Sequence, residues 1–180
     1  IPMIEDGYVL DITKALTDLG VYDKLDAGAV AILSNLTGTP DIYDLPLGLN
    51  VEGFWYNKAL FAQAGIEAAP ATYDEMLADC EKLMAAGIPP FAVGGADKWP
   101  ATRLINAYVM RKLGVDALAK CAAGELSYVN DGSVEGALLL QDMCNKGYFG
   151  EGPTTVDYNT AANMLMSGKA AMLYNGSWFT

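Results

Sequence analysis

Residues 51–61 read VEGFWYNKALF, and within them a strand pattern passes directly into a helix pattern. Val51–Tyr56 is rich in β-branched and aromatic residues, which are typical of a short strand. Lys58–Ala64 favours a short helix, and Gly65 provides a natural stop for it. Because a strand leads at once into a helix, this stretch favours an α/β fold.

Repeated helix stops punctuate the rest of the chain. The clearest helix starts with a capping box at Thr72 and Glu75, continues through an apolar stripe that includes Cys80, and stops at Gly87. Similar signals predict further helices at 22–36, 99–113, 115–123, 133–146 and 158–166. Short strands are predicted at 91–93 and 170–174, with an extended segment at 42–45. Helices alternating with short strands again indicate an α/β architecture.

A boundary is predicted just before the opening strand. Residues 46–50, PLGLN, break the pattern, and acidic residues become rarer after this point. We therefore expect residues 1–47 and residues 54–180 to belong to different lobes, joined by a crossover at 48–53.

The composition excludes several classes of function. The formal net charge of −11 argues against nucleic acid, since phosphate binding needs clustered Lys and Arg. The chain has no histidine, which removes His-based catalysis and His-ligated zinc. No phosphate-binding or nucleophile-elbow motif occurs, and no apolar run reaches the roughly 18 residues that span a bilayer. We therefore expect a binding protein with no metal and no cofactor.

The three cysteines are far apart and include no CxxC pair, which argues against a zinc site and a disulfide framework. Cys80 and Cys144 fall on the apolar stripes of predicted helices. We therefore expect both to be buried free thiols.

Several short motifs, taken in order, resemble family 1 extracellular solute-binding proteins, the maltose-binding-like class. A proline-marked approach leads to a strand that ends in YNK, and a short helix, an AGI turn and a capped long helix come next. Blocks similar to the family's KGYF and GKAAM…GSW motifs follow. Each match alone is weak, but their shared order and spacing are specific. The matching residues are Leu45–Pro46, Val51–Phe61, Ala64–Ile66, Pro70–Glu75, Gly147–Phe149 and Met166–Trp178.

The resemblance implies a type II periplasmic-binding-protein-like α/β fold. Residues 1–47 would be the tail of the amino-terminal lobe, and residues 54–180 an incomplete second lobe. A protein of this family binds a sugar between its lobes and docks onto the permease subunits of an ABC importer. It works in the periplasm or lipid-anchored on the outer face of the membrane. Family members are more than twice this length, so we expect the isolated piece to bind sugar poorly and to self-associate.

The strongest site candidate is Trp178, with Gly176 and Ser177 before it. Sugar recognition needs a flat apolar face for C–H groups and planar polar groups for hydroxyls. The family resemblance assigns a stacking tryptophan to this position, whereas the structural alternative is that Trp178 fills the core.

Four further residues are candidate ligand contacts. Glu52 and Asn50 lie at the predicted crossover, where a carboxylate or amide can meet sugar hydroxyls, although Glu52 could equally be a surface strand residue. Asp97 and Trp99 follow a predicted strand, where α/β folds gather ligands. Asp97 could instead cap the helix that starts at Trp99, and Trp99 could be core.

Two rival readings stay open. A glycoside hydrolase would need two carboxylates roughly 5 to 10 Å apart, for which Glu52 and Asp97 are the candidates. An interaction module would have no small-molecule site, and Trp178 would then be dispensable for binding.

Overall fold

The chain folds into two compact units, Ile1–Val51 and Glu52–Thr180. The computed structural model describes residues 2–179. The boundary between the units falls inside residues 48–53, where the sequence predicts a crossover. In the described part of the chain, no helix is long and apolar enough to cross a membrane.

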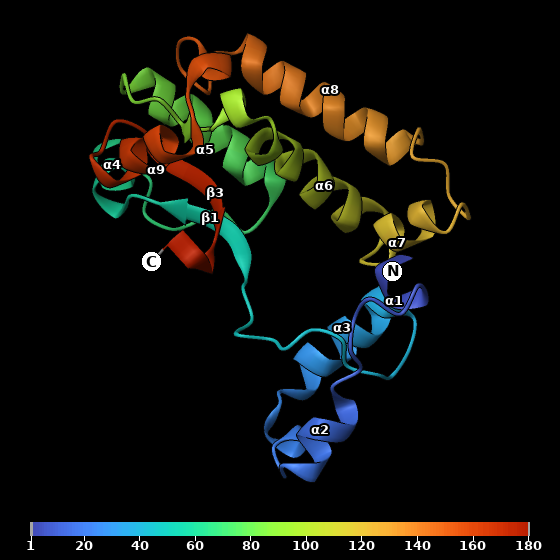
Figure 1. Cartoon of the computed structure of the whole chain (residues 1–180). Coiled ribbons are helices and arrows are strands. Elements are labelled where there is room, and N and C mark those ends of the chain that lie inside the picture. The colour runs from blue at the N-terminus through green and yellow to red at the C-terminus, as the bar shows by residue number, and fades with distance from the viewer. Residues whose placement is uncertain (1, 180) are drawn as a thin grey trace. The chain divides into compact units, whose positions relative to one another are not determined.

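The first unit is small and helical (Figure 1). Its core holds the fully buried Ile42, whose carbonyl accepts from the backbone N–H of Ile12 at 2.8 Å. The helix predicted at 22–36 is in fact a short 3-10 turn followed by a separate helix, because the Asp26 side chain caps the backbone N–H groups of a new first turn. The segment 42–45 forms no strand. The helices are α1 (Pro2–Glu5), α2 (Thr13–Asp18) and α3 (Ala27–Thr37).

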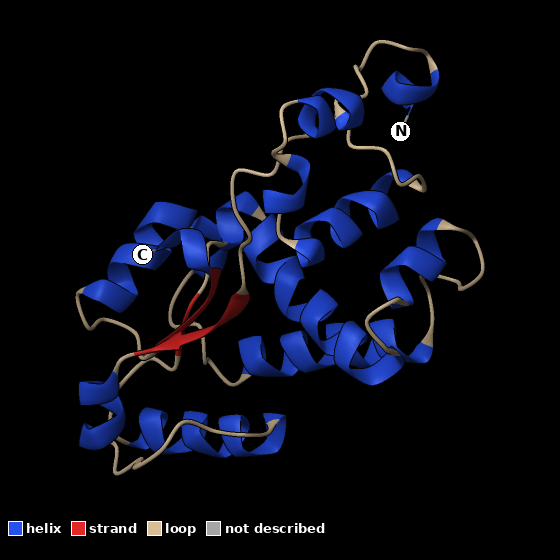
Figure 2. Cartoon of the chain, turned by 90° about the horizontal axis from the view of Figure 1, so that it is seen from below, coloured by secondary structure: helices blue, strands red, loops and turns tan. Residues whose placement is uncertain are grey.

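The second unit is built around three strands, β1 (Glu52–Tyr56), β2 (Phe91–Ala92) and β3 (Met172–Gly176), drawn red in Figure 2. Their order is β1–β3–β2, with β1 antiparallel and β2 parallel to the central β3. Two of the predicted strands are confirmed within a residue. The third lies two residues further along than predicted, so that its end meets Ser177 and Trp178.

Helices cover both faces of this sheet. Alternate residues of β3 point to opposite sides. Met172 joins the larger apolar cluster, which draws on α5, α6 and α8, whereas Leu173 joins a second cluster with the alanines of α9. α6 and α8 pack side by side (Figure 1). The helices of this unit are α4 (Lys58–Gln63), α5 (Tyr73–Ala85), α6 (Trp99–Leu113), α7 (Ala117–Ala122), α8 (Asp131–Asn145) and α9 (Tyr158–Met166).

The predicted α/β architecture is confirmed, and so are most of the predicted helix starts and ends. α9 has the predicted bounds, and α5 begins with the predicted capping box between Thr72 and Glu75. α8 starts earlier than predicted, because the side chain of Asn130, rather than Ser133, caps it by accepting from the Ser133 backbone N–H.

The two helical cysteines differ in exposure. Cys80 is fully buried, and burial raises the pKa of its thiol to about 12, so it stays protonated. Cys144 is exposed, which corrects the prediction of a buried thiol. The buried stripe of α8 runs through Gly132, Gly136 and Met143. Cys144 lies one residue, about 100°, beyond that stripe.

Replacing Thr72 with alanine is expected to lower the free energy of unfolding by about 1 kcal/mol, because the Glu75 backbone N–H loses its acceptor at 3.2 Å. Thr72→Ser keeps the hydroxyl and should cost much less. Urea unfolding followed by circular dichroism measures both, and equal losses in the two variants would contradict the capping role.

Candidate functional site

The candidate site lies at one edge of the sheet. β2 and β3 run parallel, so their carboxyl ends meet at that edge. β1 runs the other way and begins there, with Glu52 directly opposite Gly176. This register brings Glu52 beside the Gly176–Trp178 segment and near the loop that follows β2. Ligands of open α/β sheets bind at such carboxyl ends.

The loop after β2 is fixed tightly to the start of α9. A Cβ atom on Gly94 would lie 2.8 Å from the Tyr158 Cα, and one on Gly95 would lie 2.4 Å from the Pro153 carbonyl oxygen. Glycine therefore allows the two segments to touch. Asp97 completes the junction by accepting the Tyr158 backbone N–H at 2.6 Å. Asp97 thus binds the first backbone N–H of α9, whose N-cap is Asp157, and does not cap α6 as the alternative interpretation of the sequence supposed.

Trp99 enters the site from a strained turn. The preceding residue, Lys98, has φ +66°, a backbone conformation that side-chain-bearing residues rarely adopt. Such strain persists where the surroundings enforce it. The Trp99 ring lies 5.2 Å from the Tyr158 ring at an angle of 35°, and 39% of Trp99 is exposed. Trp99 is therefore a half-covered aromatic surface, not a core residue.

Trp178 lies in the 3-10 turn Ser177–Phe179 that follows β3. Its six-membered ring lies directly over Gly176, because a Cβ atom there would fall 2.0 Å from Trp178 Cζ3. Its indole Nε1–H donates to the Tyr158 hydroxyl at 2.9 Å. With 42% of its surface exposed, Trp178 is held in place yet remains partly accessible to a ligand.

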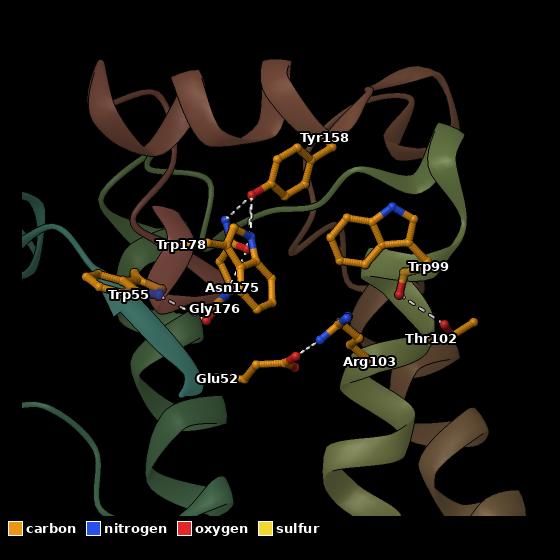
Figure 3. Close-up of polar contacts among 9 residues, drawn as sticks. All are labelled: Glu52, Trp55, Trp99, Thr102, Arg103, Tyr158, Asn175, Gly176 and Trp178. Carbon is orange, nitrogen blue, oxygen red and sulfur yellow. Dashed lines mark hydrogen bonds and ion pairs between the residues drawn. The ribbon is translucent and has the colours of Figure 1, made fainter. Parts of the chain in front are cut away.

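Tyr158 and Asn175 form the polar centre behind these rings (Figure 3). The Asn175 amide Nδ2 donates to the Tyr158 hydroxyl at 3.1 Å, and its Oδ1 accepts the Gly176 backbone N–H at 2.9 Å. The Asn175 carbonyl accepts the Trp55 indole N–H at 3.0 Å. Trp55 is half-buried and packs against the second apolar cluster. Asn175 itself is buried, with 2% of its surface exposed.

Arg103 adds a cation to the same edge. It forms an ion pair with Glu52, and its guanidinium carbon lies 4.8 Å from the Trp99 ring centroid and 5.4 Å from that of Trp178. Figure 3 shows the Arg103–Glu52 ion pair lying below the indoles of Trp99 and Trp178. The arrangement therefore combines two open aromatic faces with planar polar groups.

The structure brings together most of the predicted candidates. Four of them share this edge of the sheet: Glu52, Trp99, Gly176 and Trp178. Ser177 lies between the last two in the sequence. Asp97 binds the backbone N–H of Tyr158, whose hydroxyl contacts Trp178. Asn50 belongs to the first unit.

Sequence reasoning missed three members of the cluster. Tyr158 gave no signal, and Asn175 lies in a matching family block but was not chosen as a contact, because their roles depend on contacts between distant segments. Arg103 could have been found, since residues four apart share one face of a helix and Arg103 stands four after Trp99.

A family profile described as bacterial extracellular solute-binding protein matches residues 2–180. The chain belongs to this family. The family is extracellular or periplasmic, and so is the protein to which this chain belongs. Matching residues 2–180, the profile takes in both units and every member of the cluster.

Curated relatives of the chain include an ABC transporter extracellular-binding protein of Pyrococcus horikoshii, 31% identical over 76% of the chain and 31% of the relative. The multiple sugar-binding protein of Streptococcus mutans is 30% identical over 76% of the chain and 34% of the relative. The chain thus spans about a third of the length of these proteins.

Solved structures agree on the fold. A chitin oligosaccharide binding protein superposes with a TM-score of 0.86 at 35% identity, over 94% of this chain and 41% of that one. A protein from work on xylan utilisation by Caldanaerobius polysaccharolyticus gives 0.88 at 30% identity, over 99% and 44%. The predicted type II periplasmic-binding-protein fold is confirmed.

Proposed function

We propose that the protein containing this chain binds a sugar or oligosaccharide between two lobes and delivers it to an ABC importer. The observation that carries the proposal is the pair of part-exposed indoles, Trp99 and Trp178, that flank Arg103 at the carboxyl ends of β2 and β3. Indole faces suit the C–H surface of a sugar ring, and guanidinium and carboxylate groups suit its hydroxyls. The names of the sugar-binding relatives support the same ligand class.

In this proposal, residues 54–180 are part of the second lobe, residues 48–53 the crossover, and residues 1–47 the tail of the first lobe. The ligand-binding residues are Trp178, Ser177, Gly176, Glu52, Asn50, Asp97 and Trp99, with Asp97 acting through Tyr158 and Arg103 added from the structure. Closure follows if the sugar makes contacts from both lobes, because those contacts favour the closed state.

We propose binding without catalysis. A hydrolase would need a carboxylic acid and a second carboxylate free to act at a glycosidic bond. Glu52 is paired with Arg103, and Asp97 accepts a backbone N–H of α9. Both carboxylates therefore have structural partners that favour the binding role. Reducing-sugar release over a panel of glycans tests this, and turnover abolished by Glu52→Gln would overturn it.

The partners follow from the family. We propose docking onto ABC permease subunits, with a lipid anchor or free diffusion in the periplasm as the two modes of retention. We also propose that the isolated 180-residue chain self-associates, since large apolar side chains such as Val115 and Val129 are 90% and 80% exposed. Light scattering that shows a clean monomer would contradict this last point.

A thermal-shift screen of the full-length protein against mono- and oligosaccharides tests the proposed function. A ligand at 100 times its Kd stabilises the folded state by about 2.7 kcal/mol, enough to raise Tm by a few degrees. We expect at least one sugar to do this and amino acids or peptides to have no effect. A shift produced by peptides alone would reject the sugar assignment.

Replacing Tyr158 with phenylalanine is expected to weaken sugar binding by about tenfold. The change removes the acceptor of the Trp178 and Asn175 N–H groups and keeps the ring that stacks on Trp99. Titration calorimetry on the full-length protein measures the loss. Tyr128→Phe is the control, because the Tyr128 hydroxyl donates to Asn106, outside the cluster. Equal losses in both variants would contradict the positioning role.

A further inference from the structure

The guanidinium of Arg103 lies close to the rings of both Trp99 and Trp178. It stands one helical turn after Trp99 on α6, so the two side chains share a helix face. The α6–β3 packing brings its guanidinium within 5.4 Å of the Trp178 ring centroid as well. A guanidinium is planar and weakly hydrated, which suits it to lie against indoles while its N–H groups point outward. A cation is therefore built into this wall of the proposed sugar site.

Glu52 supplies the matching anion. It is the first residue of β1, and its pairing with Gly176 across the sheet holds it next to the Trp178 turn. The side chains of Arg103 and Glu52 are 35% and 30% exposed, so water screens them only in part. An uncompensated guanidinium in such a place would attract a carboxylate on a ligand. Paired with Glu52, it does so much less.

We propose that Glu52 is a specificity-determining residue that makes this site select uncharged sugars over uronic acids. Its carboxylate neutralises Arg103 and takes up at most part of the five N–H donors of the guanidinium, and the rest remain for sugar hydroxyls. A sugar carboxylate would have to compete with Glu52 for the same cation, in a chain whose formal net charge is already −11. This inference rests on the proposed sugar-binding function.

The test compares Glu52→Gln with the unaltered full-length protein. Glutamine keeps the shape and one acceptor but leaves Arg103 uncompensated. The probes are uncharged disaccharides (maltose, cellobiose, xylobiose and diacetylchitobiose) and the carboxylated cellobiouronic and digalacturonic acids, all measured by calorimetry. We expect the unaltered protein to prefer uncharged disaccharides. In Glu52→Gln the ratio of affinities should shift toward the carboxylated probes by about tenfold.

Two further variants isolate the cause. Glu52→Gln combined with Arg103→Gln removes the cation too, and the tenfold shift should disappear. Glu135→Gln makes the same change of charge at a distant ion pair, with Lys112 between α6 and α8, and should leave the ratio unchanged. Unchanged thermal unfolding midpoints will show that the variants fold.

The outcomes separate the inference from the function beneath it. If the unaltered protein binds uncharged sugars and Glu52→Gln keeps the same ratio, the inference is wrong and the proposed function stands. A shift of the same size in Glu135→Gln would also overturn it, because net charge alone would then explain the effect. If the unaltered protein binds neither class of sugar, the proposed function falls and the inference falls with it.

Discussion

Replacing Trp178 with alanine in the full-length protein is expected to weaken sugar binding at least about 30-fold, which corresponds to about 2 kcal/mol. The indole is 42% exposed, so a ligand can cover its open face. Its ring is held in advance by Gly176 below it and by the Tyr158 hydroxyl at its edge. A group that is already ordered loses little conformational entropy on binding, so removing it costs nearly all of its contact energy.

Calorimetry with the sugar that gives the largest thermal shift measures the effect. Trp178→Tyr keeps an aromatic plate and should lose less than the alanine variant. Tyr128→Ala is the matched control, because Tyr128 is a 59% exposed aromatic residue whose hydroxyl donates to Asn106, outside the aromatic cluster. Unchanged affinity in Trp178→Ala would reject the stacking role and would mean that Trp178 has only a structural role.

The sequence predicted the elements of this fold because their signals are local. The capping box at Thr72 and Glu75 lies within four residues, and the strand-to-helix passage at 51–61 is continuous in the chain. The α3 break at Asp26 was missed, although an N-cap side chain within an apolar run is itself a local signal. The exposure of Cys144 was misjudged, because a shift of one residue rotates a helical side chain away from its stripe.

The candidate site was predictable only in part. Trp178 was proposed from the family resemblance, and Trp99 because it follows a predicted strand. The contacts that orient them were not, since Asp97 reaches Tyr158 across 61 residues and Arg103 reaches Glu52 across 51. Pairings of this kind depend on strand order, and neither helical periodicity nor short motifs encode that order. Asp97 is an example: the sequence offered a ligand contact or a cap for the helix at Trp99, whereas its carboxylate accepts the Tyr158 backbone N–H at the start of α9.

Replacing Gly176 with alanine is expected to weaken sugar binding by about tenfold or more, although this residue presents no side chain to a ligand. The new methyl carbon would fall 2.0 to 2.3 Å from three atoms of the Trp178 ring. The ring must therefore swing away, which breaks its Nε1–H bond to Tyr158 and turns its open face out of line. Overpacking of this kind also lowers the free energy of unfolding, typically by about 1–3 kcal/mol.

Gly53→Ala is the matched control for the backbone. Gly53 lies on β1 opposite Asn175, its φ is not positive, and a Cβ atom there would meet nothing within 4 Å. This variant should bind sugar normally. Equal losses in Gly53→Ala and Gly176→Ala would indicate a general disturbance of the sheet and contradict the specific clash.

The double variant Gly176→Ala with Trp178→Ala decides whether glycine acts through the indole. If it does, the methyl group at position 176 no longer clashes once the Trp178 ring is removed, and the double variant should bind no more weakly than Trp178→Ala alone. Its unfolding free energy should likewise recover the part lost to overpacking. Additive losses would instead mean that Gly176 and Trp178 contribute separately, since independent sites add and coupled ones do not. Gly176 is thus expected to matter for sugar affinity only because a side chain at position 176 would occupy the space of the Trp178 ring.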